Sequence, residues 1–187
     1  MRSSYSSPFC LLLFLMVVGC CLPTRYAVAQ DGQISSATSI PSVEDPRTDA
    51  VRKQLQANYD EMGAGFAVYD IDAATKYFAK DYKIIGKTNR KQTLHKLREL
   101  YHRLLNNALS SQMKTTITLC TLKGDTATVQ THMQLAVHVR REDGSEAYIE
   151  GDDLSRDFWV KRNGAWQVKQ SRDFDFTITL NGQKLIE

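Results

Sequence analysis

The sequence contains little cysteine. Three of its four cysteines, Cys10, Cys20 and Cys21, lie within the first 21 residues, and only Cys120 comes later. If the first segment is removed, the remaining chain has one thiol and can form no intrachain disulfide. Cys120 has no basic neighbour in its threonine-rich segment that would activate it. We therefore expect it to be buried and unreactive.

The sequence also lacks a large excess of positive or negative charge. The chain has 24 Lys and Arg against 21 Asp and Glu, and loss of Arg2 and Arg25 with the first segment leaves 22 against 21. A chain this close to neutrality has no basic character that indicates nucleic acid or an anionic surface as a partner. We therefore expect no nucleic-acid binding.

The sequence lacks a phosphate-binding loop, a catalytic-triad pattern and a set of metal ligands. His132 and His138 fall on one strand, but at about 3.3 Å per residue they lie roughly 20 Å apart, too far for one ion. His95 and His102 lie two turns apart on a helix, and no third ligand is evident. We expect no metal and no cofactor.

No apolar run is long enough to cross a bilayer comfortably, since the one near the N-terminus has about 14 residues. Arg2, this run and Ala27-Val28-Ala29 have the order of a signal peptide that is cleaved after Ala29. We predict an exported protein, periplasmic or secreted, with a signal peptide at 1–29. The alternative is a lipoprotein anchored at Cys20, because residues 17–20 also resemble a lipobox. Residues 30–44 have the composition of a disordered leader.

One domain is expected from residue 45 to residue 187. Asp45 and Pro46 are typical of a helix start, and the following apolar residues recur at three- and four-residue spacing. We also expect a short helix capped by Asp72 and ending at Phe78, a strand at 82–85, and a third helix from residue 88 or 89 to about 109. The stripe of the first helix consists of Val51, Leu55, Tyr59, Met62 and Phe66.

Beyond residue 110 the periodicity of apolar residues changes from helical to two. Strands are predicted at 113–122, 126–140, 148–162 and 165–180, separated by turn signals around Gly124, Gly144 and Gly164. Helices followed by successive strands indicate an α+β fold with helices on one face of an antiparallel sheet.

The last two strands form a predicted hairpin whose loop length decides which side chains face the core. A three-residue loop at 162–164 pairs Val160 with Trp166 and Phe158 with Val168. A two-residue loop would instead mix apolar and charged side chains on both faces, and a one-residue slip inverts every side chain. We therefore expect Trp166 to be buried and Trp159 to lie on the opposite face. The same register places Arg156, Gln170 and Arg172 on the buried face.

The order of elements, with FAKDYKIIGK (78–87) and RDFWVKRNGAWQVKQS (156–171), resembles the nuclear transport factor 2-like superfamily, and its SnoaL-like branch in particular. The resemblance covers about residues 46–182. It implies a cone: a curved antiparallel sheet wrapped around N-terminal helices, with an apolar pocket. Such domains include isomerases, dehydratases, polyketide cyclases and transport factors, so the fold alone does not settle the function.

The resemblance also implies where a site would lie. In ketosteroid isomerase relatives the catalytic base follows a segment like FAKDYKIIG, and that position is Gly86 here, which has no side chain. We expect Asp81 to close a turn and Tyr59 to pack with its hydroxyl at the surface. The remaining polar residues near the expected pocket are our candidates for ligand binding: Tyr82, Tyr148, Glu150, Arg156, Gln170 and Arg172.

The missing catalytic set favours an exported, pocket-bearing domain without catalysis, which binds a ligand or takes part in assembly. The alternative is an isomerase, cyclase or dehydratase that acts on a small apolar molecule. A buried carboxylate with a raised pKa near Arg156 would favour the enzyme, whereas a pocket filled by Trp166 and Phe158 would favour the other hypothesis. We also predict a homodimer through the outer sheet face around Trp159, and no membrane contact unless Cys20 is lipidated.

Overall fold

The computed structural model describes residues 45–86 and 91–186. The predicted signal peptide, the lipobox at Cys20 and the leader at 30–44 lie outside this part of the chain. Within it, no helix is both long and apolar enough to cross a membrane.

The domain begins with α2, Pro46–Ala67. The side chain of Asp45 accepts a hydrogen bond from the backbone N–H of Arg47 at 3.0 Å, and Pro46 occupies the first turn, where its missing N–H costs nothing. This start is the one that the sequence predicts. The buried residues of α2 include Leu55, Tyr59, Met62 and Phe66, so most of the predicted stripe faces the core.

The short elements after α2 differ from the prediction in their bounds. Helix α3 is Ile71–Thr75, and its cap is Asp70, whose side chain accepts a hydrogen bond from Ala73 N, rather than Asp72. Strand β1 is Phe78–Ile85, and β2 is Lys91–Thr93. Helix α4 is Leu94–Leu105 with Thr93 as its cap, shorter than the expected helix. Pairing of residues 91–93 with β1, and of Ala108 with β4, takes the flanking residues into the sheet.

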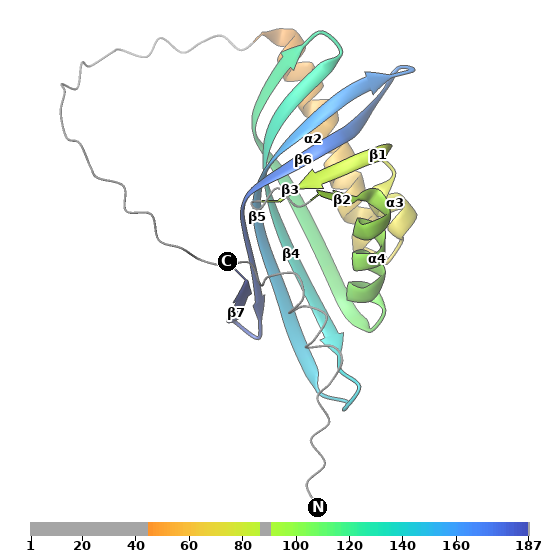
Figure 1. Cartoon of the computed structure of the whole chain (residues 1–187), viewed down its shortest axis with the longest axis vertical. Helices are drawn as coiled ribbons and strands as arrows, with labels where there is room; N and C mark the ends of the chain where they lie inside the picture. The colour runs from red at the N-terminus through yellow and green to blue at the C-terminus, as the bar shows by residue number, and fades with distance from the viewer. Residues whose placement is uncertain (1–44, 87–90, 187) are drawn as a thin grey trace, which may run out of the picture. The chain divides into compact units, whose positions relative to one another are not determined.

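The long strands are β3 (Ala108–Lys123), β4 (Thr126–Arg140), β5 (Glu146–Arg162) and β6 (Ala165–Leu180), with a short β7 (Gln183–Ile186) that the sequence did not indicate. The described strands form one seven-stranded sheet in the order β2-β1-β6-β5-β4-β3, with β7 beside β6. All neighbours are antiparallel except β1 and β6. Figure 1 shows the sheet as strongly curved. The predicted α+β class, with a curved sheet around helices, is confirmed.

The predicted register of the β5–β6 hairpin is wrong. Arg162 pairs with Ala165 and Lys161 with Trp166, which leaves Asn163-Gly164 as a two-residue loop. Both loop residues have positive φ, 51° and 80°, as a type I′ turn requires. A β-bulge between Phe158 and Trp159 then changes the pairing further along the hairpin.

This register places both tryptophans on the face of the sheet that packs against α2, which we call the inner face. Trp166 is 3% exposed, as expected, but Trp159 is 0% exposed and pairs with Val168. Phe158 and Arg156 lie on the opposite, outer face. The expected dimer contact cannot be centred on Trp159, because that side chain is enclosed in the core. Dimerisation through the outer face stays a prediction.

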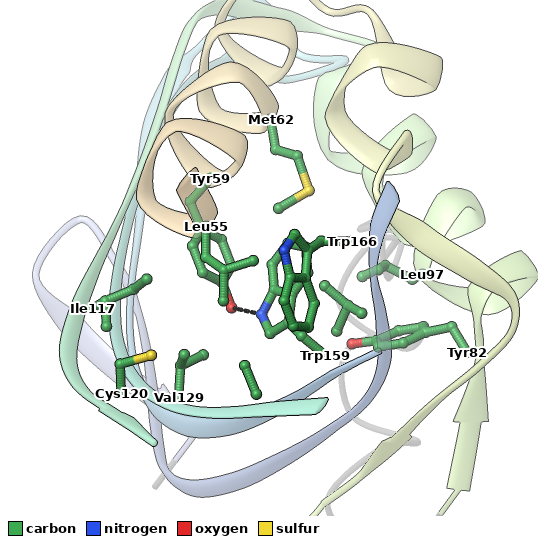
Figure 2. Packing of buried hydrophobic residues seen from close by; sticks show 12 residues of the cluster. Leu55, Tyr59, Met62, Tyr82, Leu97, Ile117, Cys120, Val129, Trp159 and Trp166 are labelled. Carbon is green, nitrogen blue, oxygen red and sulfur yellow. Dashed lines mark hydrogen bonds between the residues drawn. The ribbon is translucent and has the colours of Figure 1, made fainter. Parts of the chain in front are cut away.

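The core is built around the side chains of α2, as Figure 2 shows. The strands curve around Tyr59 and Met62, and Trp159 packs edge-on against Tyr59 with 5.2 Å between ring centroids. Cys120 is buried in the same cluster, as predicted. The tryptophans therefore fill one end of the space between α2 and the sheet.

Strand β3 is an edge of the sheet, and α2 closes part of it. The side-chain amide of Gln56 donates to Thr115 O at 2.7 Å and accepts from Ile117 N at 2.9 Å, as a neighbouring strand would. Glycine at position 63 allows this close approach, since a Cβ there would collide with the carbonyl oxygen of Met113. An edge covered in this way cannot pair with another chain.

Gln56→Ala should lower the free energy of unfolding by about 1 to 2 kcal/mol, because two backbone groups of β3 lose their partner while helix propensity is preserved. Urea unfolding measures this loss. Gln54→Ala is the matched control, because Gln54 is exposed on the same helix. Equal stability of the two variants would show that Gln56 does not protect the edge.

Candidate functional site

A row of polar side chains lies on the inner face of β5. Successive side chains of a strand alternate between faces, so Asp153, Ser155 and Asp157 share the face of Trp159, and all are buried. Across the sheet, Ser155 pairs with Asp173 of β6, and Asp157 pairs with Ser171. We call Asp153, Asp157 and Asp173 the inner carboxyl cluster.

Hydrogen bonds attach Asp157 to the core. Tyr59 of α2 donates its hydroxyl hydrogen to Asp157 Oδ2 through a short contact. Trp159 Nε1 in turn donates to the Tyr59 hydroxyl at 2.9 Å (Figure 2). From β1, Tyr82 donates its hydroxyl to Ser171 Oγ at 2.8 Å. Contacts from α2 and β1 thus hold Asp157 and its neighbour Ser171 in one arrangement.

Two carboxyl oxygens of the cluster have no hydrogen-bond partner. Asp153 Oδ1 and Asp157 Oδ1 are buried and accept no hydrogen bond, and their residues are only 8% and 6% exposed. A buried polar atom without a partner is costly and calls for an explanation. Asp173 is less buried than the other two, so it marks the side on which the cluster meets solvent.

Burial and mutual repulsion raise the pKa values of these carboxyls above the usual range. Burial raises the pKa of Asp153 to about 7, and the charge of Asp173 adds to this effect. Burial, with the charge of Asp157 second, raises the pKa of Asp173 to about 6. Burial also raises the pKa of Asp157, while hydrogen bonds from Ser171 and Tyr59 oppose the rise.

Tyrosines complete the surroundings. Burial raises the pKa of Tyr59 and Tyr82, and the charge of Asp157 raises both further. The pKa of Tyr101 on α4 is raised by burial and then by the charges of Asp153 and Asp157, and its hydroxyl donates to Met113 Sδ at 3.7 Å. All three tyrosines therefore remain neutral hydrogen-bond donors near carboxyls that can lose or gain a proton close to neutral pH.

The profile of the SnoaL-like domain family matches residues 50–172. The chain belongs to the SnoaL-like domain family. Among curated protein sequences no match is found.

Solved structures support the same fold. A conserved protein from Planctomyces limnophilus has a TM-score of 0.58 and 10% identity, covering 71% of this chain and 98% of that one. A hexachlorocyclohexane dehydrochlorinase has a TM-score of 0.53 and 12% identity over 74% and 94% of the two chains. A nuclear transport factor 2-like protein from Salmonella enterica has a TM-score of 0.51 and 14% identity over 68% and 92%. Identities this low establish the fold of the SnoaL-like chain and no activity.

Five of the six predicted ligand-binding residues lie on the outer face of this SnoaL-like domain. Arg156 faces Arg172 across β5 and β6, and its guanidinium lies 4.9 Å from the ring centroid of Phe174. Gln170 pairs with Phe158 there. The assignment of Arg156, Gln170 and Arg172 to the buried face is wrong. The two-residue turn reverses the faces of β5, and the register shift after Val168 then moves Gln170 and Arg172 of β6 to the outer face.

The other three candidates are divided between the two faces. Tyr148 is 56% exposed and stacks on His138 with 4.3 Å between ring centroids. Glu150 accepts a hydrogen bond from Thr179 and lines a shallow outer groove of about 420 Å³. Tyr82 alone reaches the inner carboxyl cluster.

Two residues that were expected to be structural have clear places. Asp81 does not close a turn, because it lies within β1, and its carboxylate pairs with Lys169. The hydroxyl of Tyr59 is not at the surface, because Tyr59 is buried and donates to Asp157. His132 pairs with Asp152, and His138 with Glu146, on the outer face. Within 45–86 and 91–186, no group of three potential ligands could hold a metal ion.

The sequence does contain a signal for the inner carboxyl cluster. Asp153, Ser155 and Asp157 alternate with Leu154, Arg156 and Phe158, and Trp159 continues the first series. An Asn-Gly pair is the strongest short-range indication of a two-residue hairpin loop. A two-residue loop at this pair places Asp153, Ser155 and Asp157 on the same buried face as Trp159, whereas the apolar pairing pattern places them on the other face.

Proposed function

We propose that this SnoaL-like protein catalyses proton transfer on a small organic substrate, as an isomerase, cyclase or dehydratase does, with Asp153 as the group that accepts and returns the proton. The observation that carries the proposal is a group of three carboxyls on one inner face, two of which are buried and have an unpaired oxygen. A general base works best when its pKa lies near the working pH, and that of Asp153 is about 7.

The other residues have supporting roles. Asp173 repels the charge on Asp153 and so keeps its pKa high. Asp157 and Tyr59 form a hydrogen-bonded pair behind the site, and Tyr101 remains a neutral phenol. The dehydrochlorinase of the same fold acts on hexachlorocyclohexane, as its name states. A base that takes a proton from carbon would suit chemistry of that kind.

The second candidate is the ligand-binding or assembly module without catalysis. It is favoured by Trp159 and Trp166, which fill one end of the space between α2 and the sheet. Phe158, which we expected to help fill a pocket, lies on the outer face instead. Buried carboxyls with raised pKa values, the feature expected of the enzyme, are present at Asp153 and Asp157, although on the opposite face from Arg156. Export and dimerisation remain part of the proposal for either function.

The proposal is tested with 5-nitrobenzisoxazole, which gives a coloured cyanophenolate when a base removes its carbon-bound proton and the N–O bond breaks. The protein should accelerate this reaction, with a rate that rises with pH around an apparent pKa of about 7. Asp153→Asn should lower the rate by about 100-fold or more, the range typical of a lost general base.

Glu150→Gln provides the matched control, because Glu150 lies on the same strand and on the outer face. Its rate should equal that of the unmodified protein, and both variants should keep the same far-ultraviolet circular dichroism. A folded Asp153→Asn variant with an undiminished rate would exclude Asp153 as the base. Loss of the rate in Glu150→Gln alone would support the outer face as the site.

A further inference from the structure

Carboxylates of described residues raise the pKa of Asp153 in the inner carboxyl cluster. The causes that act on Asp153 include the charges of Asp173, Asp157 and Asp152, and each raises the pKa of Asp153. In the described part of the chain, Tyr59 of α2 donates to Asp157, Tyr82 of β1 donates to Ser171, and Tyr101 of α4 donates to Met113. Burial raises the pKa of each of these tyrosines. Asp153 and Asp173 therefore hold protons at positions where a bound cation could take their place.

The unpaired oxygens are the independent indication that something binds. Asp153 Oδ1 and Asp157 Oδ1 are each on a side chain more than nine-tenths buried, and neither accepts a hydrogen bond. An ammonium group has three N–H donors and no acceptor. Such a group could donate hydrogen bonds to these oxygens. A carboxylate ligand would meet only repulsion from the same atoms.

We infer that the substrate or ligand of this site carries an amine, whose ammonium group enters from the side of Asp173 and pairs with the inner carboxyl cluster. This inference deepens the proposed function and rests on it for the location of the site. Asp173, the least buried of the three, makes the first contact, and Asp153 stays available to accept a proton from carbon. The ammonium replaces the protons that the carboxyls otherwise hold.

The test compares three ligands of nearly equal size by titration calorimetry: 2-phenylethylamine, 2-phenylethanol and phenylacetate. At pH 7.5 the amine should bind at least tenfold more tightly than the alcohol, and the acid more weakly than either. Amine binding should weaken as pH falls through about 7 and about 6, where Asp153 and Asp173 take up protons. Titration in two buffers of different ionisation enthalpy should show proton release on binding.

Asp173→Asn should remove most of the preference for the amine, while Asp125→Asn, an exposed turn residue, should leave it intact. Thermal unfolding checks that both variants are folded. Equal binding of amine and alcohol, preference for the acid, or no binding of any of the three overturns the inference. Amine preference without base catalysis of 5-nitrobenzisoxazole would instead overturn the proposed function alone.

Discussion

Trp159→Ala is expected to lower the free energy of unfolding by about 3 to 5 kcal/mol, the range for removing a large aromatic side chain from a core. Trp159 is 0% exposed, packs edge-on against Tyr59, and donates the hydrogen bond that Tyr59 Oη accepts. Its loss leaves a cavity between α2 and β5. Urea unfolding followed by circular dichroism measures the change.

Phe158→Ala is the matched control for this prediction. Phe158 is the preceding residue and another large aromatic, but it lies half-buried on the outer face. The Phe158→Ala change should lower the free energy of unfolding clearly less than Trp159→Ala. A larger loss from Phe158→Ala than from Trp159→Ala would restore the register with a three-residue loop and contradict the faces described above.

The second large effect is a fall in stability between pH 4.5 and pH 8. Asp153 and Asp173 have folded-state pKa values of about 7 and about 6, above the ordinary value of 3.8. The folded state therefore binds more protons than the unfolded state in this range, so its advantage is complete at low pH and is lost as pH rises through the folded pKa values. At about 1.4 kcal/mol per pKa unit, the titration of Asp153 between pH 4.5 and its folded pKa corresponds to a loss of about 3.5 kcal/mol. Asp173 adds less per pKa unit, because it is partly exposed and solvent screens its charge.

Exposed carboxyls do not obscure this effect. The pKa values of Glu61, Asp81, Glu99 and Asp143 are lowered, chiefly by hydrogen bonds from neighbouring side chains, so their stabilisation is lost only as pH falls below the ordinary range of carboxyls. Unfolding free energies at several pH values provide the measurement. Asp153→Asn should flatten the profile and stabilise the protein at pH 8, whereas Asp125→Asn should change neither. A profile that rises from pH 4.5 to pH 8 would show that the cluster is not buried as described.

The predicted pH dependence of stability and the proposed base catalysis both depend on Asp153. If Asp153 costs stability at neutral pH, its presence in the core is unfavourable for folding alone, and natural proteins accept such costs mainly at functional sites. Stabilisation by Asp153→Asn, together with loss of base catalysis, would therefore connect the unfavourable burial of the carboxyl with the proposed reaction.

The sequence alone determined the local elements of this protein. Asp45 and Pro46 predicted the start of α2, the two-residue periodicity predicted β4 and β6 with their observed bounds, and Cys120 was correctly expected to be buried. These features depend on neighbouring residues, whose propensities and hydrogen bonds are local. The short elements α3, β2 and β7 were misplaced or missed, because a few residues carry too little periodicity and tertiary pairing sets their ends.

Only the tertiary structure decided which face of β5 is buried, and with it the candidate site. Both faces of the hairpin carry large apolar residues, Phe158 and Val160 on one and Trp159 on the other, so alternation of hydrophobicity cannot choose between them. The turn at Asn163-Gly164, the bulge after Phe158 and the packing of Tyr59 against Trp159 make the choice together. Since a slip of one residue exchanges the two faces completely, this choice moved Arg156 to the outer face and buried Asp157.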